Sequence, residues 1–314
     1  MGGGPAGLSA ATWLARHRRR VVLLDAGERR NRWVEQTHGY LGLDPVDPRT
    51  LLARATEACC RYPTAELVEG RAPSIEGAPD GGFRVRVDDG GAAGRSLLVR
   101  RLVLATGVED EFPDVDGFFD HYGADVFHCP SCDGYEARDR EVVAFGWSEK
   151  VAAFALGLLD WAAEVTVVTD GTAFEGDAEC RAALERHGVA LLEDDAEALL
   201  GVRGALEGVR LRGGSTIPCQ LAFFSIEHRP RNELAIQLGC DLTSEGCLVV
   251  DEHGQTTVPG VYAAGDVIPG LQLVQVAAAQ GAVAGVACAM SLRGEPAGPG
   301  TPEPAPDGAA ETGT

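Results

Sequence analysis

The chain has 314 residues, of which 45% are hydrophobic and 24% charged, and this composition is typical of a soluble globular protein with two domains. Its formal net charge of −20 disfavours nucleic acid and anionic membranes as partners, and we find no apolar run of the ~18 to 20 residues that a membrane helix needs. Nine cysteines, an odd number, and the lack of a signal peptide before the first glycines predict a cytoplasmic protein with mostly free thiols.

The start of the chain has the pattern of a dinucleotide-binding unit. Gly2, Gly4 and Gly7 form GxGxxG, in which glycines permit a tight turn, close approach of the backbone to a pyrophosphate and close helix packing. An amphipathic helix follows. The segment VVLLD then reads as a buried parallel strand, and its last residue, Asp25, is placed to bind a ribose hydroxyl. Glycines, helix, strand and acid in this order predict dinucleotide binding.

One part of this pattern is incomplete. The glycine motif should follow a strand, yet only Met1 precedes it. Without that strand, its neighbours would lack a partner at the centre of the sheet. We therefore expect the natural protein to have roughly 5 to 10 more apolar, β-branched residues before Met1, which is a typical strand length.

The next segments are expected to complete this unit. A helix capped near Asp47 follows a polar loop, and the loop contains His38, which either approaches the cofactor or is an ordinary loop histidine. AELVEG and FRVRVDDGG are predicted strands, with a turn at Asp88 to Gly91. LLVRRLVLATG is predicted as one strand that ends in Thr106 and Gly107, where small residues let the backbone come close to a bound cofactor.

The stretch HCPSCDGYE, residues 128–136, carries the most specific chemistry. Cys129 and Cys132 form a CxxC pair that can close and reopen a small disulfide ring, and a helix N-terminus there would lower the pKa of one thiol. Asp133 follows at once and could exchange a proton with the leaving thiolate. The alternatives are plain packing and half of a zinc site, but no second ligand pair is present, so we predict no metal.

A second βαβ pattern begins after about residue 113 and predicts a second nucleotide-binding unit. Its glycine fingerprint has decayed, because Gly146 remains while Ser148 and Val151 occupy the other two positions. The second strand ends at Asp170 without a nearby Arg or Lys, although a 2′-phosphate needs positive charge there. NADPH binding is therefore doubtful.

The last part of the chain returns to the first pattern. VYAAGD reads as a strand that ends in Gly265 and Asp266, and a helix with small residues, suited to close packing, begins at about Gln275. Residues 293–314 are rich in Pro, Gly and acids and are predicted to be disordered.

Four motifs in order, GGGPAGLSAA, LVLATG, CPSCDG and TTVPGVYAAGD, resemble the low-molecular-weight thioredoxin reductase family over about residues 1–292. The resemblance implies an α/β fold with two Rossmann-like, three-layer ββα nucleotide-binding domains, the second inserted in the first. Residues 1–112 and 246–292 would form a discontinuous FAD-binding domain, and residues 113–245 an inserted NAD(P)-binding-like domain that carries the CxxC. A homodimer is also implied. The implied FAD contacts are Gly2, Gly4, Gly7, Asp25, Thr106, Gly107, Gly265, Asp266 and Gln275.

The resemblance also assigns roles within the CxxC stretch. Cys132 would face the flavin and reduce it, Cys129 would exchange with substrate, and Asp133 would be the acid–base residue. The chain departs from the family because it lacks GxGxxA and the basic run that hold NADPH. Two branches share this loss: dithiol oxidases of pathways such as those that make gliotoxin and holomycin, which pass electrons through FAD to oxygen, and flavin-dependent ferredoxin–thioredoxin reductases.

Three functions follow from these observations. The leading expectation is an FAD-dependent thiol–disulfide oxidoreductase that oxidises a small-molecule dithiol, with oxygen as acceptor. The alternative is a reductase of a thioredoxin-like protein, fed by ferredoxin or weakly bound NAD(P)H. A non-catalytic flavin-binding protein is the third, and the intact CPSCD disfavours it, because binding alone needs neither paired thiols nor an acid.

Overall fold

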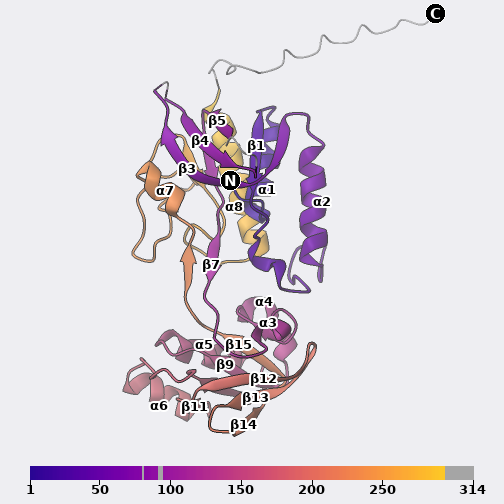
Figure 1. The fold of residues 1–314 in the computed structure, drawn as a ribbon, viewed down its shortest axis with the longest axis vertical. Helices are drawn as coiled ribbons and strands as arrows, with labels where there is room; N and C mark the ends of the chain where they lie inside the picture. Colours follow the sequence, from indigo (N-terminus) through magenta and orange to yellow (C-terminus); the bar gives the residue numbers. More distant parts are fainter. Residues whose placement is uncertain (80, 91–94, 294–314) are drawn as a thin grey trace, which may run out of the picture.

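The computed structural model of the chain describes residues 1–79, 81–90 and 95–293. It has two units, which lie one above the other in Figure 1 and are joined by two extended segments. The predicted disordered tail, residues 293–314, lies outside the described residues except for Arg293. The α/β organisation, with a second Rossmann-like unit inserted in the first, is as predicted.

The first unit combines both parts of the chain around one core. Its helices and strands are α1 (Pro5–Arg16), β1 (Val21–Asp25), the short 3-10 helix η1 (Arg30–Arg32), α2 (Pro48–Cys60), β2 (Ala65–Glu69), β3 (Arg71–Gly77), β4 (Phe83–Asp88), β5 (Arg95–Val99), β6 (Leu102–Leu104), α7 (Glu233–Leu238), β17 (Val261–Ala263) and α8 (Val274–Ser291). The α2 helix begins as predicted, since Asp47 caps it by accepting hydrogen bonds from the backbone N–H groups of Arg49 and Thr50.

Two parallel strand pairs form the middle layer of this unit. β1 pairs with β2, and β6 pairs with β17. Met1 and Gly2 run between the two pairs, where the central strand was expected. Gly2 N donates to Leu24 O at 2.8 Å, and Ala105 N donates to Met1 O at 2.8 Å. The N-terminal backbone thus connects β1 to the end of β6.

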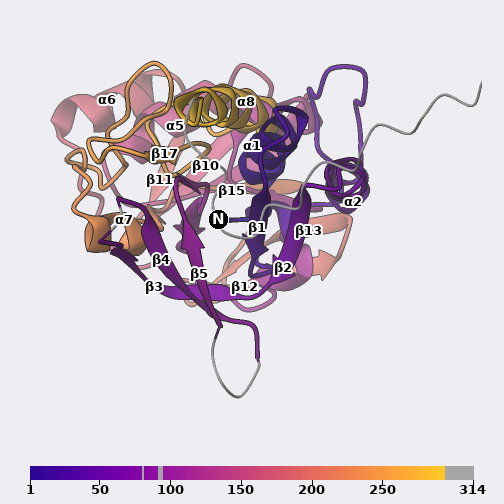
Figure 2. The ribbon, with the colours of Figure 1, turned by 90° about the horizontal axis from the view of Figure 1, so that it is seen from above.

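The other two layers cover opposite faces of these strands (Figure 2). The antiparallel sheet β3–β4–β5 lies on one side, and α1 and α8 pack together on the other. Close packing of the helices depends on small residues, because a Cβ atom at Gly281 would lie 2.1 Å from Ala6 O. By length and composition α8 could cross a membrane, which the sequence analysis did not foresee, but here it packs against α1 and adds Ala284 and Cys288 to the core.

The second unit repeats the three-layer arrangement. Its five-stranded parallel sheet has the order β11-β10-β9-β15-β8, and the antiparallel sheet β12–β13–β14 forms another layer. The elements are α3 (Phe118–His121), β8 (Val126–Phe127), α4 (Pro130–Asp133), the 3-10 helix η2 (Gly134–Ala137), β9 (Glu141–Phe145), α5 (Lys150–Leu158), β10 (Glu164–Val168), α6 (Ala178–Arg186), β11 (Ala190–Leu192), β12 (Ala196–Val202), β13 (Ala205–Leu211), β14 (Thr216–Pro218) and β15 (Leu221–Phe224).

The chain crosses between the units twice, and the two crossings pair with each other. β7 (Val108–Asp110) and β16 (His228–Pro230) form an antiparallel ribbon in which His228 is opposite Asp110. Both crossings therefore bring polar side chains to the junction of the units.

Two predictions need correction. The predicted strand LLVRRLVLATG is two strands, β5 and β6, because the chain leaves the antiparallel sheet at Arg100 and joins the parallel one. The predicted domain boundary at 245/246 is too late. Ala235 and Cys240 share a core with Leu248, so the first unit resumes directly after β16, and the helix α7 belongs to it.

Candidate active site

A cavity of ≈ 570 Å³ extends along the first unit and reaches the second. Its lining includes Gly4 at the start of α1, and His38, Cys132 and Asp133 where the units meet. Among the predicted FAD contacts, those that line the cavity are Gly2, Gly4, Asp25, Thr106, Gly107, Gly265, Asp266 and Gln275; Gly7 does not. Residues predicted from five separate segments thus meet around one space of the size that binds organic cofactors.

The three glycines of the first motif have different surroundings. A Cβ atom at Gly2, where φ is +101°, would lie 2.0 Å from Ala105 O. At Gly7 it would lie 1.8 Å from Gly2 O, so this glycine serves the packing of α1 on the turn. No such contact surrounds Gly4, which borders the cavity. Gly4 is therefore the position at which a ligand could approach the backbone closely.

The carboxylate of Asp25 stabilises the glycine turn. It accepts a hydrogen bond from Gly3 N at 3.3 Å and from Gly27 N at 3.0 Å, and it forms a 2.7 Å ion pair with Arg29. Asp25 lies at the cavity wall but is buried. Its predicted contact with a ribose hydroxyl stays a prediction.

The cysteine pair lies at the start of a single helical turn. Cys129 caps α4, and its carbonyl accepts hydrogen bonds at 3.0 Å from the N–H groups of Cys132 and Asp133. Cys129 and Cys132 are joined in a disulfide. Cys132 lines the cavity and Cys129 does not, so the two sulfurs differ in what they face. The described ranges contain no group of three or more His, Cys, Asp or Glu residues that could hold a metal ion.

Asp133 is a buried carboxyl group in the wall of the cavity, only 6% exposed. Burial raises its pKa to about 7, while nearby His38 lowers the pKa and Glu136 raises it. Its side chain does not cap the following turn η2. A carboxyl group that titrates near neutral pH can both donate and accept a proton.

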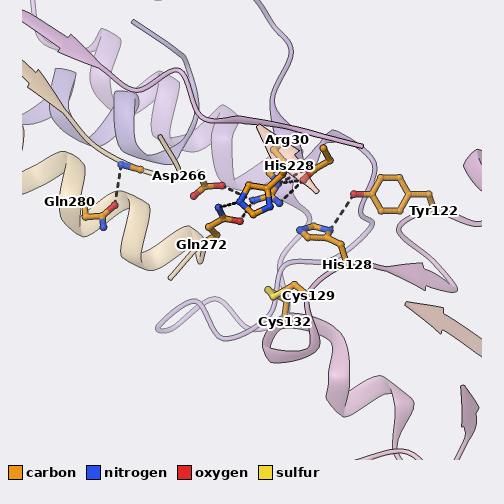
Figure 3. A network of polar contacts seen from close by, with 11 residues as sticks. Arg30, Tyr122, His128, Cys129, Cys132, His228, Asp266, Gln272 and Gln280 are labelled. Carbon is orange, nitrogen blue, oxygen red and sulfur yellow. Dashed lines mark hydrogen bonds and ion pairs between the residues drawn. A yellow bond between two sulfur atoms is a disulfide. The ribbon is translucent and has the colours of Figure 1, made fainter. Parts of the chain in front are cut away.

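A half-buried arginine that no sequence motif marked joins the crossings to the cavity (Figure 3). Arg30 on η1 binds both carboxylate oxygens of Asp110 on β7, and it donates to Asp266 at 2.9 Å and to Gln272 at 2.7 Å. Burial opposes ionisation of Asp110, but Arg30 outweighs it and holds the pKa of Asp110 below its ordinary value. Asp266 therefore faces Arg30.

Two histidines flank this arginine network in Figure 3. His128, directly before the cysteine pair, forms a 3.2 Å hydrogen bond with the Tyr122 hydroxyl. Burial and the field of Arg30 lower the pKa of His128 to about 4, so its imidazole is neutral at pH 7. On β16, His228 lies 2.8 Å from the Gln272 amide nitrogen. Each of these contacts joins segments more than five residues apart, so no local pattern in the sequence could reveal them.

Comparison with known proteins decides the family. Residues 1–281 match the model of the pyridine nucleotide-disulphide oxidoreductase family. The chain belongs to this family. Relatives include thioredoxin reductase aclD of Aspergillus oryzae, 29% identical (93% of this chain, 95% of that protein), and thioredoxin reductase sirT of Leptosphaeria maculans, 30% identical (91% and 90%). The oxidoreductase of Agrobacterium tumefaciens has a crystal structure that matches with a TM-score of 0.81 and 38% identity, over 93% of this chain and 96% of that one.

These matches confirm the predicted resemblance to thioredoxin reductase-like flavoproteins, and they show that the chain is an oxidoreductase that acts on sulfur groups. Members of this family typically bind FAD. The cavity fits such a group, because the amide nitrogen of Asn31 is buried in its wall without a hydrogen-bond partner in the described part of the chain. A cofactor could also approach the backbone closely at two glycines, Gly4, where no atom surrounds the Cβ position, and Gly107, which lies in a left-handed turn.

The glycine turn of the second unit differs from that of the first. Val151, at the third position of the decayed fingerprint, is fully buried, and its Cγ2 atom would lie 2.8 Å from a Cβ atom at Gly146. Asp170 follows β10 and accepts a hydrogen bond at 3.1 Å from Ala196 N. Burial raises the pKa of Asp170, whose nearest acidic neighbours add to the effect. Val151 thus packs this turn as Gly7 packs the first one, and Ser148 stands at the position of Gly4. Asp170, on which the charge of Arg212 also acts, stands where a 2′-phosphate needs positive charge.

Proposed function

We propose that this chain is an FAD-dependent dithiol oxidase, which closes a disulfide in a small-molecule dithiol with oxygen as the final electron acceptor. The altered nucleotide-binding turn, with Val151 buried in it and Asp170 after the next strand, is the observation that carries this proposal, because it disfavours NADPH as the electron donor. Electrons would then enter from the substrate thiols. FAD bound along the cavity would supply the acceptor for the electron pair of the enzyme dithiol and the route by which that pair reaches oxygen.

The chemistry of the protein begins at Cys129. A substrate thiolate attacks its sulfur, the Cys129–Cys132 bond breaks, and Cys132 leaves as a thiolate. The second substrate thiol, once deprotonated, attacks the substrate sulfur of the mixed disulfide and releases Cys129. The substrate loses two electrons and two protons, and the cysteine pair gains the electrons. The position of Cys132 in the cavity wall supports its role as the thiol next to the flavin.

Asp133 is the proposed proton carrier of these steps. Its position directly after Cys132 lets it accept a proton as substrate thiols become thiolates and donate one to a leaving cysteine. A pKa of about 7 supports both functions at neutral pH. His128 supplies no charge to the pair, since its imidazole is neutral.

The opposite direction is the second candidate. The relatives aclD and sirT are named thioredoxin reductases, which favours reduction of a protein disulfide. With the second nucleotide-binding turn altered, the electrons would come from reduced ferredoxin or from weakly bound NAD(P)H. In that reaction Cys129 would attack the partner disulfide.

Anaerobic stopped-flow absorbance separates these functions. Oxidised holoenzyme is mixed with dithiothreitol, NADPH, NADH or reduced ferredoxin, and flavin absorbance is followed. Dithiothreitol should bleach the flavin, and later mixing with oxygen should restore it with formation of hydrogen peroxide. Bleaching by micromolar NADPH within milliseconds would reject the proposal, and bleaching by ferredoxin alone would favour the second candidate. The same measurement is made on Cys129→Ser, which removes the sulfur that the substrate thiolate attacks. Cys60→Ser, which changes an exposed cysteine, is its matched control.

A further inference from the structure

A histidine of the first unit reaches the cysteine stretch of the second. His38 lies in the loop between η1 and α2, whose ends are held by reciprocal backbone hydrogen bonds between Thr37 and Val46 at 2.8 and 3.1 Å. Its Nδ1 atom is 3.2 Å from the Asp44 carboxylate, and its Nε2 atom is 3.6 Å from the Glu136 carboxylate. The paired loop ends thus fix His38 between two acids from different units.

These groups range from exposed to buried. The Asp44 side chain is 52% exposed, Glu136 is 34% exposed and His38 is 24% exposed, whereas Asp133 is 6% exposed. His38 and Asp133 both line the cavity. The Oε2 atom of Glu136 is buried without a hydrogen-bond partner in the described residues, as expected for an oxygen that receives a partner during a reaction.

The proposed reaction needs such a route. Each substrate dithiol delivers two protons, and a carboxyl group as buried as Asp133 cannot exchange them with bulk water directly. His38 and Glu136 are the ionisable groups whose charges act on Asp133. The carboxylates that lie beside His38 are those of Asp44, at 3.2 Å, and Glu136, at 3.6 Å. The Asp44 carboxylate can hold the imidazole in one orientation, as a carboxylate does for other catalytic histidines.

We propose that His38, positioned by Asp44 and acting with Glu136, relays protons between Asp133 and solvent. The inference rests on the proposed acid–base role of Asp133. The imidazole accepts a proton at Nε2 from the carboxyl side and releases one from Nδ1 to the exposed Asp44 carboxylate, which passes it to water. A separation of 3.6 Å exceeds a hydrogen bond, so the transfer runs through one bridging water or a small rotation of Glu136.

The alternative for His38 is a purely structural role, in which it only holds the two units together. The following test separates this role from the relay. Flavin reduction by dithiothreitol is measured anaerobically from pH 5.5 to 9 in holoenzyme with wild-type sequence, His38→Gln or His253→Gln. The last is the matched control, an exposed histidine 3.8 Å from Glu252. His38→Gln should be reduced roughly 10- to 100-fold more slowly at pH 7, within the usual range for a proton-transfer group, and added imidazole should restore much of the rate.

A second measurement needs no substrate. In a Cys129→Ser background, a thiolate at Cys132 beside oxidised flavin gives a long-wavelength absorbance band. The intensity of this band is recorded against pH, and it responds to the charge on the neighbouring Asp133. Because protonated His38 favours the ionised carboxylate, His38→Gln should move the apparent midpoint of Asp133 to higher pH. Slow reduction without imidazole rescue, or an unmoved midpoint, would overturn the relay. If dithiothreitol fails to reduce wild-type enzyme, the dithiol oxidase proposal fails. The titration midpoint still decides whether the charge of His38 acts on Asp133.

Discussion

Replacing Asp133 by Asn tests the acid–base assignment and a consequence for stability in the same protein. An unfolded aspartate titrates near 3.8, and burial raises the pKa of Asp133 to about 7 in the folded chain. The folded state therefore binds more protons between these two pH values. The stabilising contribution of the protonated carboxyl is complete below pH 3.8 and is lost as the pH rises through 7. The gap between the two pKa values corresponds to about 4 kcal/mol.

Asn cannot ionise, so Asp133→Asn should remove this pH dependence. The free energy of unfolding of the variant, minus that of wild type, should increase by up to about 4 kcal/mol from pH 4 to pH 8. Turnover should fall by ~10²- to 10⁴-fold, as expected for loss of a positioned acid–base group. Because the carboxylate does not cap η2, no loss of ~1 kcal/mol from a missing cap should appear.

The assay is urea unfolding of the holoenzyme at pH 4, 5, 6, 7 and 8, with flavin and tryptophan fluorescence as separate probes, beside turnover of dithiothreitol. A difference in unfolding free energy that does not change with pH would refute the raised pKa. Near-normal turnover in the variant would remove Asp133 from the mechanism and leave only the two thiols.

Two further predictions concern the cysteine pair and the helix contact. Cys129→Ser should leave a Cys132 thiolate beside oxidised flavin and show a long-wavelength absorbance band. Cys132→Ser should lack the band and trap substrate through Cys129 as a mixed disulfide. The reverse pattern would exchange the roles of the two cysteines. Gly281→Val should lower the free energy of unfolding by about 1 to 3 kcal/mol or more, because its Cβ would lie 2.1 Å from Ala6 O and must push α1 from α8. Gly157→Ala on α5 is the control, since no atom lies within 4 Å of its Cβ position, and it should stabilise by about 0.5 to 1 kcal/mol; equal melting temperatures for both variants would contradict the packing argument.

The sequence by itself determined the elements with strong local signals. GxGxxG, VVLLD and the CxxCD stretch each combine a short spacing with a chemical requirement, so the glycine turn, β1 and the cysteine turn lie where they were predicted. Hydrophobic periodicity located α1, because helix formation depends on residues three and four apart, and the capping residue Asp47 located the start of α2. The helix α8 begins one residue before its predicted start at Gln275. The break at Arg100 was missed, since both halves of that segment are apolar enough for one strand.

Only the tertiary structure decided the surroundings of the reactive groups. The pKa of Asp133 depends on burial, which comes from the meeting of two units, and no spacing in CPSCD reports it. Arg30 read as one of several loop arginines until β7 and the segment after β17 placed Asp110 and Asp266 beside it. His38 likewise acquired Glu136 as a neighbour from about 100 residues away. A charged group takes its chemistry from the dielectric and the charges around it, and these are set by contacts between segments that are distant along the chain.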